Sequence, residues 1–269
     1  TKLMPVDTEN IITSIYDKAG RSLSHFMTTG DDDFSLSIAN LGRFRCNVFR
    51  QRGTFGAVIR VVHFELPSYK DMRIPESIMK LSELNKGLVL VTGAAGSGKS
   101  TTISYIIDRI NENRNCHILT LEDPIEFLHR HKKSIVSQRE VKIDSESYSS
   151  ALRAAMRQSP DVILVGEMRD YETIDIAMTA AETGHLVLST LHTIGAANTI
   201  DRVIDVFPAS QQQQIRVQLA GVLEGVVTQQ LLPRIEGKGR LAAYEVMIAT
   251  HAIRNLIREG KTYQIPSLI

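Results

Sequence analysis

The sequence predicts an α/β fold, in which a mostly parallel sheet is covered by helices and a smaller α+β domain precedes it. From about residue 85 onward, short apolar runs alternate with amphipathic helical patterns, which indicates a parallel sheet with helical crossovers. A glycine-rich turn joins the first of these runs to the helix that follows it. Before them, residues 34–62 alternate apolar and polar side chains, which is typical of half-buried antiparallel strands.

The composition is that of an ordinary globular protein, with 269 residues, 43% hydrophobic residues, 23% charged residues and a net charge of +1. This length suits one large domain or two unequal ones. The near-neutral charge gives no general attraction to nucleic acid or to an anionic membrane, and no apolar run is long enough for a transmembrane helix. The two cysteines, Cys46 and Cys116, lack C-x-x-C spacing and favour a reducing cytosol over a disulfide scaffold or a structural zinc site.

The N-terminal part predicts one helix and a small antiparallel meander. Thr8 is the expected N-cap and Gly20 the expected stop of the helix, and the acidic run 31–33 is interpreted as a solvated turn. A proline-containing stretch then predicts a linker. The expected elements, in chain order, are a helix at 8–19, strands at 34–39, 43–49 and 56–62, a linker at 65–74 and a helix at 75–84.

The glycine-rich turn fills every fixed position of the phosphate-binding motif G-x-x-x-x-G-K-[ST]. It lies between a predicted buried strand at 88–92 and a predicted helix at 100–113, which is the context that the motif requires. Glycines let the backbone N–H groups point inward, and the helix N-terminus favours phosphate. We expect Lys99 to reach the β- and γ-phosphates of ATP and Ser100 to hold Mg²⁺. The residues expected to bind ATP are Gly93, Ala94, Ala95, Gly96, Ser97, Gly98, Lys99, Ser100 and Thr101.

Acidic residues follow two of the predicted strands at the edge where ligands of parallel sheets bind. The strand at 116–121 is followed by three carboxylates within five residues, Glu122, Asp123 and Glu126. So many acids beside a phosphate site would repel the substrate unless a metal ion or an attacking water lies between them. Glu167 follows the strand at 161–165, where an acid can reach the metal from the strand tip.

A further predicted strand has a histidine at each end, His185 and His192. His192, at the carboxyl end, is placed to hydrogen-bond the γ-phosphate or its attacking water. His185 lies at the opposite end, where a structural role is the simpler interpretation. The remaining helical patterns, including the one that contains Tyr148, are interpreted as packing. They cover 147–158, 171–183, a segment through 207, a long segment from 208 through 226, and 252–259.

The predicted strands at 34–64 carry five arginines and no acidic residue. Two interpretations stay open: a solvated strand face, or a cationic surface directed at a nucleotide phosphate on a neighbouring subunit. The five are Arg43, Arg45, Arg50, Arg52 and Arg60.

Taken together, these stretches resemble the secretion ATPase superfamily, and within it the type IV pilus retraction ATPases (the PilT family). The resemblance implies a RecA-like ATPase domain at 75–269 and a PAS-like N-terminal domain at 1–64, with both ends of the chain falling inside these domains. It also implies a homohexamer on the cytoplasmic face of the inner membrane, which acts on a membrane platform protein and indirectly on pilin, without nucleic acid. The stretches that carry it are Gly93–Thr101, Leu119–Glu126, Ser137–Val141, Ile163–Asp170, Ala181–Val187, Thr190–Thr193, Thr199–Arg202 and Ala252–Glu259.

The resemblance also assigns roles within these stretches. It implies catalytic parts for Glu122, His185 and His192. It makes Glu126 the base that polarises water and Glu167 the acid linked to Mg²⁺, although the reverse order stays open. Arginine fingers acting in trans would be Arg45 and Arg60, with Arg202 a weaker third candidate. Ala94 and Ala95 replace the Pro-Thr usual in this family, at positions where the motif is permissive.

Three alternatives to a retraction motor are less consistent with the sequence. Assembly and export ATPases of the same superfamily carry paired C-x-x-C motifs, whereas this chain has no cysteine after Cys116. A RecA-like nucleic-acid motor predicts a basic groove bearing aromatic residues, and aromatic residues make up only 6% of the chain. A regulator that no longer hydrolyses nucleotide would not need the three glutamates, Glu122, Glu126 and Glu167.

Overall fold

The computed structural model describes residues 2–39, 41–62, 66, 69–235, 237 and 239–269. By its internal contacts the chain divides into two compact units, Thr1–Glu65 with Glu126–Leu128, and Leu66–Ile125 with His129–Ile269. Hydrophobic side chains are buried within each unit. Residues 65, 67 and 68 of the predicted linker lie outside the described residues.

The first unit packs two helices on one face of an antiparallel sheet, which in its described residues has three strands in the order β1-β2-β3. The meander predicted from the alternating pattern is therefore confirmed. Its elements are α1 (Pro5–Ala19), α2 (Ser24–Thr29), β1 (Asp31–Ile38), β2 (Gly42–Gln51) and β3 (Thr54–Val62). Its core residues are Ile12, Tyr16, Phe26, Phe34, Leu36, Cys46 and Val48.

Two local predictions for this unit are wrong. Helix α1 begins at Pro5 rather than after a cap at Thr8. The acidic run 31–33 is not a solvated turn, because β1 already begins at Asp31. Asp32 is buried there, and its carboxylate accepts hydrogen bonds from the Tyr16 hydroxyl at 2.8 Å and from the Arg21 guanidinium at 3.2 Å. These partners compensate the cost of burying the charge.

The second unit is built on a sheet that, in its described residues, has seven strands in the order β10-β9-β4-β8-β7-β5-β6. Neighbouring strands are parallel except for β10, which is antiparallel to β9. The strands are β4 (Gly87–Thr92), β5 (His117–Glu122), β6 (Ile135–Glu140), β7 (Val162–Val165), β8 (Leu186–Leu191), β9 (Leu223–Pro233) and β10 (Arg240–Ile248).

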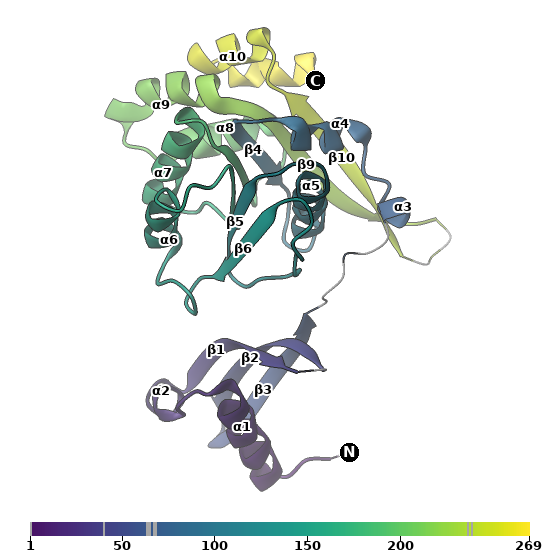
Figure 1. Ribbon diagram of the computed structural model, residues 1–269, viewed down its shortest axis with the longest axis vertical. Helices are drawn as coiled ribbons and strands as arrows, with labels where there is room; N and C mark the ends of the chain where they lie inside the picture. Colours follow the sequence, from purple (N-terminus) through teal and green to yellow (C-terminus); the bar gives the residue numbers. More distant parts are fainter. Residues whose placement is uncertain (1, 40, 63–65, 67–68, 236, 238) are drawn as a thin grey trace. The chain divides into compact units, whose positions relative to one another are not determined.

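Helices cover both faces of this sheet (Figure 1). Helices α6 to α10 contribute to the hydrophobic core on one face, and α4, η1 and α5 to the core on the other. None of the described helices is long and apolar enough to cross a membrane. The helices are α3 (Tyr69–Met72), α4 (Glu76–Met79), η1 (Lys80–Glu83), α5 (Lys99–Asn113), α6 (Tyr148–Ala155), α7 (Tyr171–Glu182), α8 (Ala196–Asp205), α9 (Ala209–Val222), α10 (His251–Arg258) and η2 (Thr262–Leu268).

The long helix predicted from 208 through 226 is corrected by the structure. Helix α9 ends at Val222, and Leu223 begins strand β9. Val226 pairs with Leu90 of β4, so tertiary pairing overrides the apolar helical spacing that continues across this boundary. Strand β9 matters for the site, because it lies beside β4 at the edge where the phosphate-binding motif begins.

Candidate active site

The phosphate-binding motif forms a tight loop between the end of β4 and the start of α5. Gly93 and Gly98 have φ angles of 139° and 92°, which L-residues with side chains rarely adopt. A Cβ added to Gly93 would lie 2.2 Å from the backbone oxygen of Gln229, and one added to Gly98 would lie 2.7 Å from Gln229 Nε2. The two glycines therefore let the loop lie directly against β9.

Lys99 holds its ammonium group over this loop. Its Nζ atom donates to the carbonyl oxygens of Gly93 at 2.8 Å and Ala94 at 3.1 Å, and the side chain is buried. Ser100 is half-buried in the first turn of α5, where the helix N-terminus favours an anion. The buried hydroxyl of Ser97 has no hydrogen-bond partner among the described residues. This cradle fits a phosphate chain in geometry and charge.

Strand β9 packs against the phosphate-binding loop, and the local sequence patterns do not indicate this contact. The side chain of Gln229 is fully buried, and its Oε1 accepts a hydrogen bond from the Thr102 hydroxyl of α5 at 2.7 Å. One residue earlier, the hydroxyl of Thr228 lies 2.9 Å from that of Thr92 at the end of β4. These contacts tie β4, β9 and α5 together around the phosphate-binding loop.

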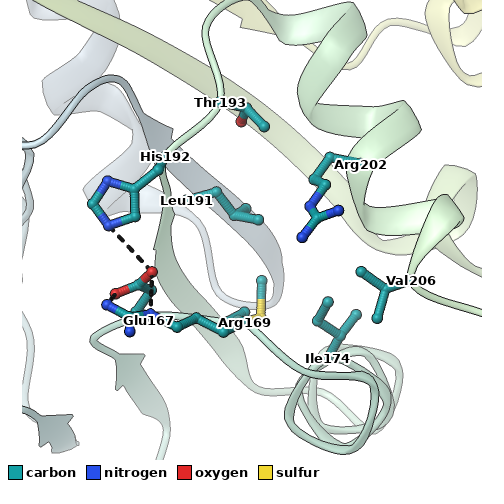
Figure 2. A pocket seen from close by; sticks show the side chains of 9 residues that line it. Glu167, Arg169, Ile174, Leu191, His192, Thr193, Arg202 and Val206 are labelled. Carbon is teal, nitrogen blue, oxygen red and sulfur yellow. Dashed lines mark hydrogen bonds and ion pairs between the residues drawn. The ribbon is translucent and has the colours of Figure 1, made fainter.

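Glu167 follows β7, and its carboxylate is held by two neighbours (Figure 2). Nε and Nη2 of Arg169 each lie 2.6 Å from a carboxylate oxygen, and Nε2 of His192 lies 3.2 Å from Oε1. Burial acts to raise the pKa of Glu167, but the hydrogen bonds from Arg169 and His192 and the charge of Arg169 outweigh it, so the pKa is lowered. Glu167 is therefore an ionised oxygen donor at neutral pH.

A pocket of about 420 Å³ lies beside this pair and includes Arg202 of α8 in its lining. The Arg202 side chain points into the pocket in Figure 2. Ile174, Leu191 and Val206 supply apolar parts of the wall. The structure thus places the third candidate arginine in the same unit as the phosphate-binding loop, in the lining of a pocket that Arg169 and Glu167 also line.

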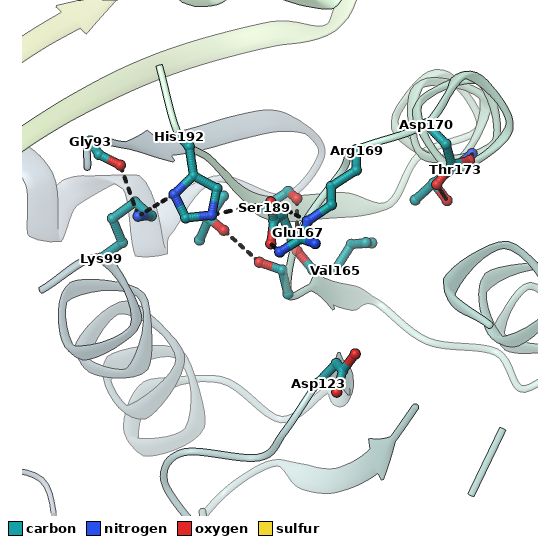
Figure 3. Close-up of polar contacts among 12 residues, drawn as sticks. Gly93, Lys99, Asp123, Val165, Glu167, Arg169, Asp170, Thr173, Ser189 and His192 are labelled. Carbon is teal, nitrogen blue, oxygen red and sulfur yellow. Dashed lines mark hydrogen bonds and ion pairs between the residues drawn. The ribbon is translucent and has the colours of Figure 1, made fainter. Parts of the chain in front are cut away.

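His192 connects the phosphate-binding loop to Glu167 (Figure 3). Its Nδ1 lies 3.4 Å from Lys99 Nζ, while its Nε2 contacts Glu167. Since an ammonium group only donates and a carboxylate only accepts, this pattern fits the neutral tautomer with its proton on Nε2. The adjacent parallel strands β4, β8 and β7 bring the three residues to one edge of the sheet.

Glu122 is the last residue of β5 and lies at the same edge. Glu122 Oε1 accepts hydrogen bonds from the Thr120 hydroxyl at 2.7 Å and from Gln138 Nε2 at 3.2 Å. Tyr148 of α6 also belongs here, although its sequence pattern indicated packing alone. Burial, followed by the charges of Asp123, Glu122 and Glu167, raises the pKa of its phenol, which is therefore a neutral group among three carboxylates.

Of the remaining predicted site residues, one lies at the opposite end of β8 and three belong to the first unit. His185 lies at the amino end of β8, and its Nδ1 donates to the backbone oxygen of Ala180 at 2.9 Å. Glu126 is exposed and is grouped with the first unit. In that unit, Arg45 pairs with Asp33 at 2.9 Å and lies opposite Arg60 in the strand register. Arg45 therefore has an acidic partner just outside the acid-free stretch. The catalytic roles of these four residues, like those of the other predicted site residues, stay predictions.

The donors expected to hold Mg²⁺ suit that ion. Among the described residues no group of three or more His, Cys, Asp or Glu forms a ready metal cage. Mg²⁺ bound with a nucleotide needs only one or two protein oxygens, because phosphates and waters complete its octahedron. The Ser100 hydroxyl and the ionised Glu167 carboxylate are hard oxygen donors of the required kind.

A phosphate-binding loop that follows the first strand of a parallel sheet, with an acid at the end of a second strand, defines a P-loop ATPase with a RecA-like core. The family model for type II/IV secretion system proteins matches residues 57–255. The chain belongs to this family, and within it to the pilus retraction ATPases, as the following relatives show.

The chain is 48% identical to the type IV pilus retractation ATPase PilT of Pseudomonas aeruginosa, over 99% of this chain and 78% of that protein. It is 47% identical to a twitching motility protein of Neisseria gonorrhoeae, over 97% of this chain and 69% of that protein. A crystal structure of the pilus retraction motor PilT with bound ADP matches it with a TM-score of 0.94 and 50% identity, over 99% of this chain and 77% of that chain. The predicted fold class and family are therefore confirmed.

Proposed function

We propose that this chain is the subunit of a homohexameric motor that hydrolyses ATP with Mg²⁺ to power retraction of a type IV pilus. The observation that carries the proposal is the contact series Lys99–His192–Glu167, which joins the phosphate-binding loop to the acid expected at the metal. The names of the full-length relatives supply the direction of the work, which is retraction.

Within this proposal each residue at the sheet edge has a defined task. Lys99 neutralises charge on the β- and γ-phosphates, and the Ser100 hydroxyl and Glu167 carboxylate hold Mg²⁺. When bound there, the ion would neutralise the charge that develops on the phosphate oxygens. His192 contacts both Lys99 and Glu167 and keeps the Lys99 ammonium group and the Glu167 carboxylate at a fixed spacing.

We assign Glu126 as the base that orients the attacking water and Glu167 as the acid linked to the metal. The Glu167 carboxylate is fixed by Arg169 and His192, which suits a ligand with a constant position. Glu126 is exposed, and its carboxylate can take up a proton without leaving a buried charge unpaired. Glu122, hydrogen-bonded at the end of β5, supports the same acidic edge.

The proposal completes each site with a neighbouring subunit. Arg45 and Arg60 lie side by side on β2 and β3 of the first unit, and we assign them as fingers that act on a nucleotide held by the next subunit. Arg45 must then exchange Asp33 for phosphate oxygens, which an arginine does readily because its planar guanidinium binds both kinds of group. We propose that the motor works at the cytoplasmic face of the inner membrane, where it acts on a platform protein and through it on pilin.

The experiment that tests the direction of the motor is deletion of the gene in its host. The proposal predicts cells that carry excess pili and no longer twitch, and that are restored by the natural gene but not by its Lys99→Ala variant. Cells without pili would instead identify an assembly ATPase and would overturn the proposal. The Lys99→Ala comparison separates loss of ATP turnover from loss of the protein.

A further inference from the structure

Strand β6 ends at Glu140 and contains most of the stretch Ser137–Val141, which belongs to the family resemblance and of which only Gln138 has been described at the site so far. Glu140, at the end of this strand, is only 3% exposed. Its Oε2 accepts a hydrogen bond from the backbone N–H of Ile125 at 3.0 Å. Ile125 is itself buried and directly precedes Glu126. The buried carboxylate therefore fixes the backbone immediately before the proposed base.

Gln138 makes the matching contacts two residues earlier, on the same face of β6. Its Oε1 accepts a hydrogen bond from the backbone N–H of His129 at 2.8 Å, and its Nε2 donates to Glu122 at 3.2 Å. One amide thus binds the acidic segment both at its start and beyond Glu126. The strand register explains the arrangement, because Glu122 and Glu140 are paired, as are Thr120 and Gln138.

We propose that Gln138 and Glu140 are positioning residues, which clamp the segment 122–129 at three points and thereby fix the direction of Glu126. The proposal rests on the assignment of Glu126 as the base. Burying a carboxylate is costly unless its hydrogen bonds are satisfied, and an apolar side chain could fill the same space without that cost. We therefore attribute the role of Glu140 to the hydrogen bond that it accepts and not to packing. Between the anchored N–H groups of Ile125 and His129 only three residues intervene.

The clamp leads to a specific kinetic expectation. Neither β6 residue is among the described contacts of the phosphate-binding loop, so removing one should leave ATP affinity almost unchanged. A base displaced by about 1 Å can cost roughly 100-fold in rate. Loss of the clamp should therefore lower kcat while KM and the dissociation constant of ATP change little, which is the pattern of an interaction made in the transition state.

The test compares variants of the full chain in its oligomer. Glu140→Ala removes the acceptor, whereas Glu140→Gln keeps an oxygen that can accept the Ile125 N–H. Gln138→Leu removes the second anchor, and Ser137→Ala, whose hydroxyl contacts His117 on β5, is the matched control on the same strand. We expect at least a tenfold loss of kcat in Glu140→Ala and Gln138→Leu, recovery of most activity in Glu140→Gln, and the wild-type rate in Ser137→Ala.

The rate of amide hydrogen exchange in residues 122–129 measures how firmly this segment is held, independently of catalysis. Exchange at the Ile125 amide should rise at least tenfold in Glu140→Ala, and adding Glu140→Ala to Glu126→Gln should cause little further loss of kcat. Unchanged exchange, or losses of kcat that multiply in the double variant, would overturn the clamp. A wild-type rate in Glu126→Gln alone, with faster exchange in Glu140→Ala, would instead refute the assignment of the base. If Glu140→Ala does not fold, the same criteria apply to the kcat of Gln138→Leu and to hydrogen exchange at the His129 amide in that variant.

Discussion

Nε2 of His192 lies 3.2 Å from Oε1 of Glu167, so the histidine that follows β8 contacts the acid that follows β7. The same imidazole ring reaches Lys99 with its other nitrogen at 3.4 Å. A group that accepts on one side and donates on the other is therefore required at this position. Side chains that offer both functions should replace His192 better than those that offer neither.

The first prediction compares His192→Gln with His192→Ala. Glutamine can accept from Lys99 and donate to Glu167, whereas alanine leaves both without this partner. We expect His192→Ala to lower kcat by about 10- to 100-fold, since a hydrogen bond to a charged group contributes about 1.5–3 kcal/mol. His192→Gln should keep a larger share of the activity. Equal rates for the two variants in a phosphate-release assay would show that the bridge has no role in turnover.

The second prediction concerns pH. Burial alone would raise the pKa of Glu167, and Arg169 is a main reason that it is lowered. In Arg169→Gln the pKa of Glu167 should therefore rise, and the acidic limb of the plot of kcat/KM against pH should move to higher pH. The movement should be modest and should shrink in high salt, because the Arg169 side chain is 75% exposed.

The same pair affects stability with a defined sign. Since the folded pKa of Glu167 is below its ordinary value, the pair stabilises the fold above that ordinary value, and this contribution is lost as pH falls through the folded pKa. Unfolding of the natural chain and Arg169→Gln should therefore differ at neutral pH and converge in acid. A difference that grows on acidification would contradict the ion pair as the cause.

The third prediction concerns the support behind the phosphate-binding loop. Gln229→Ala should lower the free energy of unfolding by about 1–3 kcal/mol, because it leaves the buried Thr102 hydroxyl without its acceptor. It should also weaken ATP binding, since Gln229 lies against Gly93 and Gly98. The adjacent exposed residue supplies the control, and Gln230→Ala should stay within about 0.5 kcal/mol. Denaturant titration with and without ATP measures both effects. Identical curves for Gln229→Ala and Gln230→Ala would show that Gln229 does not stabilise the phosphate-binding loop.

Much of the site could be predicted because its signals are local. The phosphate-binding loop is a continuous motif, and Glu167 and His192 each follow an apolar strand, so the geometry of a parallel sheet brings them to one edge. The contact between Glu167 and His192 follows from these two positions once β7 and β8 are neighbours in the sheet.

The features that the sequence predictions miss depend on residues that are distant in the chain. Asp32 is buried because Tyr16 and Arg21, 16 and 11 residues away, satisfy its carboxylate. Val226 joins a strand because it pairs with Leu90, which lies far back in the chain. Tyr148 reaches the carboxylates from a helix whose apolar spacing indicates only packing. Local periodicity contains none of these relationships.

The most direct test of the motor is complementation between two inactive subunits. Lys99→Ala disables its own phosphate-binding loop but keeps Arg45 and Arg60, whereas the double variant Arg45→Ala, Arg60→Ala keeps the loop but lacks the fingers. Each pure oligomer should release phosphate at no more than about one hundredth of the wild-type rate, on the scale of other groups that stabilise charge in the transition state. Mixing the two and allowing the subunits to exchange should restore activity, with a maximum at intermediate ratios. No recovery at any ratio, or full activity of the arginine variant by itself, would contradict a site completed by the neighbouring subunit.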